Sequence, residues 1–284
     1  MTSTTFPTRT TSFTAAAGVA LLALTGCVSL SPGESQVNSN SSSAEAERAN
    51  HDQPGASLTH PVEDGEVIAH MLDARETLET LRTEMVMTFE LDALWAAQDQ
   101  RLEMTTEGAE DFSEALISGT VAEDGEVLES FEAYVQDGQA ISNTDGAGWE
   151  QDLDMEPEES EDDSRYSRVA QGIGELEQLL EVDFDGAYRL SYRGSDREVF
   201  DAFEAPFSLT LDGYEPEDTE MTVDVAVDPE TFYVEEFSFT LHTKDSAGPI
   251  SLGMEIGAEY SQFNEIPALE IPEDVLEEAY GSQE

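Results

Sequence analysis

The sequence predicts an α+β fold in which a curved antiparallel sheet, a half-barrel, wraps around two or so helices. Apolar and polar residues alternate in several segments, most clearly over residues 250–260, as in a strand with one dry and one wet face. Two other segments repeat apolar residues every three or four positions, which is the spacing of an amphipathic helix. A sheet of this length twists and curls, so we expect the helices to lie in its hollow.

Residues 1–26 are expected to be a lipoprotein signal peptide. The apolar run Thr14–Leu24 is too short to span a bilayer, which needs about 20 residues, but it suits an export signal. It leads into Leu24-Thr25-Gly26-Cys27, which resembles a lipobox and makes Cys27 the lipidation site. The alternative is an ordinary signal peptide that contains a cysteine. Because Cys27 is the only cysteine, an internal disulfide and a cysteine-based zinc site are excluded.

Residues 27–63 are expected to be the lipidated cysteine followed by a disordered tether, because they hold few large apolar residues and show no periodicity. Residues 64–284 contain no second linker and no repeat, so they are expected to form a single domain. These features predict a protein anchored by lipid to the cell membrane, on its extracytoplasmic face.

Two helices are expected in this domain. The first begins at Asp64, which can cap it, and runs to about Arg82. The second runs from Ser164 to Glu181, although Gly172 and Gly174 weaken it. The apolar residues that define the two faces are Val67, Ile68, Met71, Leu72, Leu78, Leu81 and Met85 in the first, and Tyr166, Val169, Ile173, Leu176 and Leu180 in the second.

Alternation predicts the strands, which are expected over residues 85–91, 126–136, 207–211, 221–227 and 250–260. Glu123-Asp124-Gly125 and Gln136-Asp137-Gly138 are typical of hairpin turns. The segment 232–241 is apolar on both apparent faces, which either lines a ligand cavity or packs beneath a helix or loop.

Several C-terminal segments resemble the LolA/LppX–LprG-like lipoproteins. Residues 223–231 (VDVAVDPET) are similar to a strand and turn common in that superfamily, Tyr260–Asn264 and Ile271–Leu276 resemble its closing strand and ending, and Gly148-Trp149 resembles its mid-sheet tryptophan strand. The resemblance implies a LolA/LprG-like half-barrel whose hollow can hold acyl chains. It carries over no individual ligand-binding residue.

The charge of the chain excludes phosphate-backbone binding. There are 64 Asp and Glu against 11 Lys and Arg, a net charge of −53, so nucleic acid is not an expected partner. Acids spread along the whole domain are typical of a halophilic protein, because molar salt shortens the Debye length to about 3 Å and screens their repulsion. The alternative is a surface that binds calcium or a polycation.

The search for chemistry yields no catalytic residue, no metal site and no cofactor motif. The acidic run 151–163 could gather calcium weakly, but it equally suits a solvated loop. Residues 181–186 imitate the start of an EF-hand loop and fail at its first and twelfth positions, so a turn at Asp185-Gly186 is expected instead. The histidines, His51, His60, His70 and His242, have no metal-ligand spacing.

The expected function is therefore that of a lipid-anchored, non-enzymatic surface protein that binds or carries a lipid or other hydrophobic ligand in the hollow of the sheet. One alternative is an interaction or assembly module whose core is solid. Another is a carboxylate-based hydrolase, since two of 64 acids could converge. Nothing in the sequence specifies the ligand or the oligomeric state.

Lipidation can be tested directly. The mature protein, isolated from the membrane of its own cells, is expected to begin at a thioether-linked diacylglyceryl Cys27, and Cys27→Ser should release the protein from the membrane fraction. Mass spectrometry that finds an unmodified thiol on the mature protein would contradict the prediction.

Salt dependence tests whether the acidic composition is an adaptation to high salt. The domain is expected to lose secondary structure when salt falls from about 3 M to about 0.05 M, because carboxylate repulsion is then unscreened. Far-ultraviolet circular dichroism measures the loss. An unchanged spectrum across this range would rule out a salt requirement.

Overall fold

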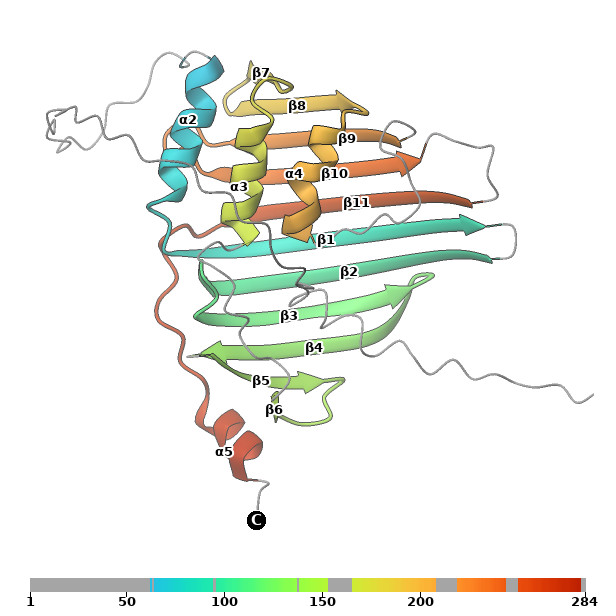
Figure 1. The fold of residues 1–284 in the computed structure, drawn as a ribbon. Helices are drawn as coiled ribbons and strands as arrows, with labels where there is room; N and C mark the ends of the chain where they lie inside the picture. Colours follow the sequence, from blue (N-terminus) through green and yellow to red (C-terminus); the bar gives the residue numbers. More distant parts are fainter. Residues whose placement is uncertain are drawn as a thin grey trace, which may run out of the picture.

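The computed structural model describes residues 62, 64–93, 96–136, 138–152, 165–207, 219–243 and 250–281. They form one open antiparallel sheet of 11 strands with the order β6-β5-β4-β3-β2-β1-β11-β10-β9-β8-β7, together with four helices (Figure 1). The predicted fold class, a large antiparallel sheet with accompanying helices, is confirmed. None of the described helices is long and apolar enough to cross a membrane.

The elements, in chain order, are α2 (Asp64–Arg75), β1 (Thr80–Ala93), β2 (Ala96–Ala109), β3 (Glu114–Glu123), β4 (Glu126–Gln136), β5 (Gln139–Thr144), β6 (Glu150–Asp152), α3 (Arg165–Glu175), β7 (Glu181–Phe184), β8 (Tyr188–Gly194), α4 (Arg197–Phe207), β9 (Thr219–Val227), β10 (Val234–Thr243), β11 (Ile250–Ser261) and α5 (Glu273–Gly281).

The sheet consists of two meanders, β1–β6 and β7–β11, that are joined where β1 pairs with β11. Their ladder runs from Arg82 opposite Ser261 to Ala93 opposite Ile250. Asn264 fixes one end of this ladder: its Oδ1 accepts a hydrogen bond from the backbone N–H of Glu79 at 2.6 Å, and its Nδ2 donates to the carbonyl of Thr77 at 3.1 Å. A polar side chain thereby replaces ladder bonds just beyond the last strand pairs.

We call the face of the sheet covered by α2, α3 and α4 the inner face (Figure 1). Beneath α4, the Phe203 ring lies 5.1 Å from Phe237 and 5.3 Å from Phe239, and Phe207 stacks on Phe237 at 5.5 Å. These side chains are buried, so aromatic rings fill the space between α4 and β10.

The three inner-face helices pack closely because α3 carries glycines at the contacts. A Cβ on Gly172 would lie 2.7 Å from the carbonyl oxygen of Ala202 in α4, and one on Gly174 would lie 3.0 Å from Leu72 in α2. The glycines that weaken this helix in isolation therefore permit its packing in the fold.

The fourth helix, α5, lies on the opposite, outer face, which the sequence analysis did not anticipate. Val275 and Ala279 of α5 pack against Ile141, which pairs with Tyr134 on the face opposite the core position Ala133. The C-terminal segment thus crosses to the outer side of β4–β6. The two predicted helices, α2 and α3, lie on the inner face, and α5 is an additional helix outside it.

Both predicted helices are shorter than expected. The first ends at Arg75, and Leu78, Leu81 and Met85 are buried in or just before β1 rather than on the helix. These residues fit both periods, and pairing with β2 and β11 selects the strand. The second helix ends at Glu175, and residues 181–184 form the edge strand β7.

The two-sided apolar pattern of segment 232–241 has a simple cause. A register shift between Val234 and Glu236 inserts an extra residue into β10, so Val234 and Phe237 face the same way although they are an odd number of positions apart. Both are buried in the core, with Phe239 and Leu241. The strand therefore has one dry face.

Two further strand predictions need correction. Phe207, expected in a strand over 207–211, ends helix α4, and the rest of that segment lies outside the described residues. Trp149, expected mid-sheet, directly precedes the edge strand β6 and lies 5.3 Å from Tyr134, beside α5.

The predicted hairpin turns are confirmed. Glu123 pairs with Glu126, which leaves Asp124 and Gly125 as a two-residue loop with φ of 50° and 81°, as a type I′ turn requires. Gln136 pairs with Gln139 across the second turn, and the Asp185-Gly186 turn separates β7 from β8.

Candidate functional site

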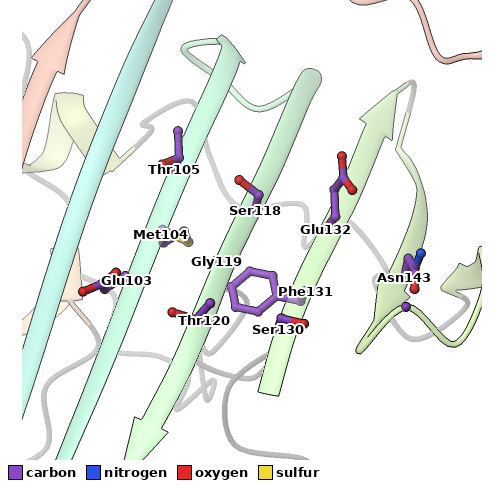
Figure 2. A pocket seen from close by; sticks show the side chains of 11 residues that line it. Glu103, Met104, Thr105, Ser118, Gly119, Thr120, Ser130, Phe131, Glu132 and Asn143 are labelled. Atoms are coloured by element: carbon purple, nitrogen blue, oxygen red, sulfur yellow. The ribbon is translucent and has the colours of Figure 1, made fainter. Parts of the chain in front are cut away.

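A hollow of about 470 Å³ opens on the outer face of β2–β5 (Figure 2). Hydroxyl and carboxylate side chains surround it, among them Ser118, Thr120, Ser130 and Glu132. On the opposite, inner face the Phe131 ring lies beside Gly119, where a Cβ would come within 2.6 Å of the ring. The missing side chain of Gly119 makes room for the phenyl ring on that inner face.

The polar groups of this hollow do not form a catalytic arrangement. Glu103 is paired with Arg101 at 2.7 Å, and neither of the described histidines, His70 on α2 and His242 on β10, lines the hollow. A hydroxyl nucleophile needs a general base within hydrogen-bond reach, and the lining residues provide no histidine for that role. This hollow therefore gives the hydrolase alternative no support.

A second outer-face hollow, of about 410 Å³, lies over Gly257 of β11. Carboxylates dominate its rim, including Glu84, Asp224 and Glu259, while Arg189 binds Glu236 at 2.9 Å. It is an acidic, solvated surface of the kind that the composition predicts.

The inner face carries a second apolar set beyond the helices, and most of its side chains are buried. Alternation and register place one set of apolar side chains from β1 to β4 on this face, and none of the four described helices crosses β3 or β4 there (Figure 1). We call this set the inner wall; it comprises Met85, Met87, Leu102, Met104, Ile117, Val121, Phe131 and Ala133.

Three methionines give the wall adaptable packing. Met85 lies opposite Met104 across the β1–β2 ladder, and Met87 lies opposite Leu102. Methionine is unbranched and polarisable, so a surface built from it adjusts to apolar partners of different shape.

Two arginines at the N-terminal end of α3 adjoin this wall, and we call them the arginine pair, Arg165 and Arg168. The Nη1 atom of Arg165 contacts the sulfur of Met85 at 3.8 Å. The Nε atoms of both arginines are buried and have no hydrogen-bond partner. Burial lowers the pKa of Arg165; the nearby Tyr260 opposes this effect and the Arg168 cation adds to it. A guanidinium nevertheless remains protonated at neutral pH.

Neighbouring polar groups hold this end of α3 in place. The backbone N–H of Val234, at the bulge of β10, donates to the Tyr166 hydroxyl at 3.0 Å, and Tyr166 packs edge-on against Tyr260 at 5.0 Å. Ser167 Oγ donates to Glu110 at 2.7 Å. Burial is the main cause that raises the pKa of both tyrosines, so both stay neutral hydrogen-bonding groups.

Two more inner-face groups are buried without a hydrogen-bond partner. One is Thr106 Oγ1, opposite Thr83 on the β1–β2 ladder. The other is Glu129 Oε1 on β4, opposite Val121. Burial raises the pKa of Glu129, and the negative charge of Asp145 raises it further. Native structures leave few such groups unpaired, so each of these groups calls for an explanation.

Most of the predicted sites cannot be located in the structure. Cys27 and the signal and tether region 1–61 lie outside the described residues, as does most of the acidic run 151–163. Over the part of the chain that is described, no three of His, Cys, Asp and Glu gather as a metal site.

The arginine pair was missed, although the sequence holds a signal for it. Arg165 and Arg168 stand three residues apart in the first turn of a helix whose first turn has no acid. Cations are unfavourable at that end of a helix dipole, so their position contradicts the usual preference.

Comparison with known families finds one match. Residues 210–280 match DUF6612, a family of unknown function, which covers β9 to α5. No match is found among curated proteins.

Solved structures include several of similar arrangement. LprF from Mycobacterium bovis is 11% identical with a TM-score of 0.43, covering 75% of this chain and 97% of LprF. A LolA superfamily protein from Nitrosomonas europaea is 11% identical with a TM-score of 0.21, again covering 75% and 97%. A beta-barrel-like DUF1849 protein from Brucella abortus is 10% identical with a TM-score of 0.23, covering 65% and 99%. With TM-scores below 0.5, none of these similarities indicates a ligand or an activity for this chain.

The raised pKa of Glu129 predicts a pH-dependent cost in stability. Below the usual carboxyl pKa of about 4.5 the group is protonated in both the folded and the unfolded state, so it costs nothing. As pH rises above about 4.5, Glu129 ionises more readily in the unfolded state than in the folded state. The folded state therefore loses stability until the pH exceeds its own higher pKa. Glu129→Gln should therefore raise the free energy of unfolding at about pH 8 and change it little at about pH 4.

Urea unfolding at constant high salt measures this difference. Glu132→Gln, on the outer face of the same strand, makes the same change in net charge and serves as the control. If the two variants gain equally at both pH values, the effect is general charge reduction and the explanation from burial is wrong.

Proposed function

We propose that this protein is an exported, lipid-anchored, non-enzymatic carrier that binds an apolar or amphiphilic ligand on the inner wall of β1–β4. The observation that carries the proposal is the combination on one face of an adaptable apolar wall and buried polar groups without protein partners. Ligand sites are mostly apolar surfaces with a few convergent polar groups, which is the composition seen here.

The location of the ligand differs from the expected one. The ligand was expected between the sheet and the helices, but aromatic side chains fill that space beneath α4. The wall beside α3 is the part of the inner face without a described helix above it. The resemblance to LolA/LprG-like lipoproteins, which implies a hollow able to hold acyl chains, supports an apolar ligand there.

The anchor and the tether complete the proposal. Lipidation at Cys27 would hold the domain at the extracytoplasmic face of the cell membrane, and residues 28–63, as a flexible tether, would have a reach of roughly 30–35 Å. The carrier would thus exchange its ligand with the membrane to which it is attached.

A second candidate is an interaction or assembly module with a solid core. The filled space beneath α4 favours it, because Phe203 and Phe237 there leave no room for a ligand. The two candidates differ in whether the inner wall takes up an apolar molecule.

Apolar binding can be tested with a matched pair of variants on β3. Val121 lies on the inner wall, and its neighbour Thr120 lies on the outer face. Val121→Trp should weaken binding of the uncharged probe N-phenyl-1-naphthylamine by roughly ten-fold, because extra bulk excludes part of the ligand. Thr120→Trp should bind like the unaltered protein. Probe fluorescence gives both affinities.

Native mass spectrometry of protein purified from its own membrane provides a second measurement. The carrier should retain a bound lipid that Val121→Trp loses. Absence of probe binding and of any co-purified lipid in the folded, unaltered protein would refute the carrier and leave the interaction module.

A further inference from the structure

We infer that the arginine pair binds the anionic headgroup of the ligand, so the ligand is an amphiphile with a carboxylate or phosphate at one end and an apolar chain at the other. This inference rests on the proposed carrier function and adds the chemical class of its ligand. The contact of Arg165 with Met85, at 3.8 Å, places the cation directly at the edge of the apolar wall.

The arginine pair has no carboxylate partner within the described residues, although the chain is rich in carboxylates. Of the eight arginines in the described residues, the five that form ion pairs do so with acids: Arg82 with Glu84 and Glu107, Arg101 with Glu103, Arg189 with Asp185 and Glu236, Arg193 with Glu220, and Arg197 with Asp201. The other three, Arg75, Arg165 and Arg168, form none within the described residues; Arg75 donates to the carbonyl oxygen of Ser167 at 3.4 Å, whereas the Nε atoms of Arg165 and Arg168 are buried without a partner. Glu110 comes close to this end of α3, where it accepts a hydrogen bond from Ser167 Oγ at 2.7 Å.

The arginine pair also has hydrogen-bond donors that the protein does not use. A guanidinium has five N–H donors, and Arg165 directs one nitrogen at a thioether, which is a weak acceptor, while its Nε has no partner. A carboxylate or phosphate accepts two parallel bonds from such a group. A ligand oxygen would therefore satisfy donors that the protein leaves unpaired.

The local positive charge also favours an anion at this end of α3. The arginine pair lies at the N-terminal end of α3, where the helix dipole contributes partial positive charge, and that first turn contains no acid. The two cations and the dipole add, so an anion is favoured here against the negative charge of the whole chain. The hydroxyl of Thr106, buried and unpartnered on the neighbouring strand β2, is a further polar group on this face.

The geometry also gives the direction of the ligand. Met85 is opposite Met104, which in turn is opposite Gly119, so the apolar surface continues from the arginine pair across β1, β2 and β3. A headgroup at Arg165 would direct its chain along this row of buried apolar side chains toward Phe131.

The test compares a fluorescent fatty acid, 12-(9-anthroyloxy)stearic acid, with its methyl ester, which has the same chain without the charge. The full-length protein is kept in salt at which it is folded, and affinities are measured by fluorescence. The acid should bind roughly ten-fold more tightly than the ester, as charge-assisted hydrogen bonds provide. In the double variant Arg165→Gln/Arg168→Gln the acid should bind no more tightly than the ester.

Arg101→Gln is the control, since it removes one positive charge from the outer face and should leave the preference intact. Circular dichroism verifies that each variant is folded, and Arg165→Lys, which keeps the charge without the planar fork, should retain part of the preference.

The outcomes separate the two levels of the proposal. Equal binding of acid and ester by the unaltered protein, or an unchanged preference in the double variant, overturns the headgroup site but leaves the carrier. Failure of both probes to bind overturns the carrier itself and the headgroup site with it. If acetate, which has no chain, binds the arginine pair as tightly as the fatty acid does, the pair is a site for free anions and the amphiphile is refuted.

Discussion

The pairing of β1 with β11 is the constraint on which the rest of the structure depends. It joins two meanders that are far apart in sequence, and it sets which side chains lie side by side on the inner face: Thr83 opposite Tyr260, and Met85 opposite Ala258. A shift of this register by one residue would turn every apolar side chain of β1 toward the outer face. Arg165 reaches Met85 only because this ladder places Met85 beneath the end of α3.

Local patterns were enough to predict much of the sheet, because burial of one face imposes alternation on each strand. The strand over 250–260 and the turn at Asp124-Gly125 follow from residues close together in sequence. The prediction failed where a non-local contact decides between two local possibilities. Leu78 and Leu81 fit a helix as well as a strand, and only the partners β2 and β11 exclude the helix.

The candidate site could not be predicted for the same reason. Its parts come from β1, β2 and α3, and no spacing in the sequence shows that Arg165 lies against Met85. The position of α5 on the outer face likewise depends on long-range contacts with Ile141. What the sequence contained was a local anomaly, namely two cations in the first turn of a helix, and its meaning depends on the surroundings that the fold supplies.

Packing alone does not explain the arginine pair. An arginine stem can cover apolar surface, and Arg165 does so against Met85. A methionine or leucine would cover the same surface without removing a charge from water, and replacing buried charges by apolar groups of similar volume often stabilises a protein. The charge therefore needs a reason other than packing, and ion pairing within the described residues does not supply one. An anion that arrives with its own apolar chain supplies both the missing partner for the guanidinium and the contact for the wall beside it.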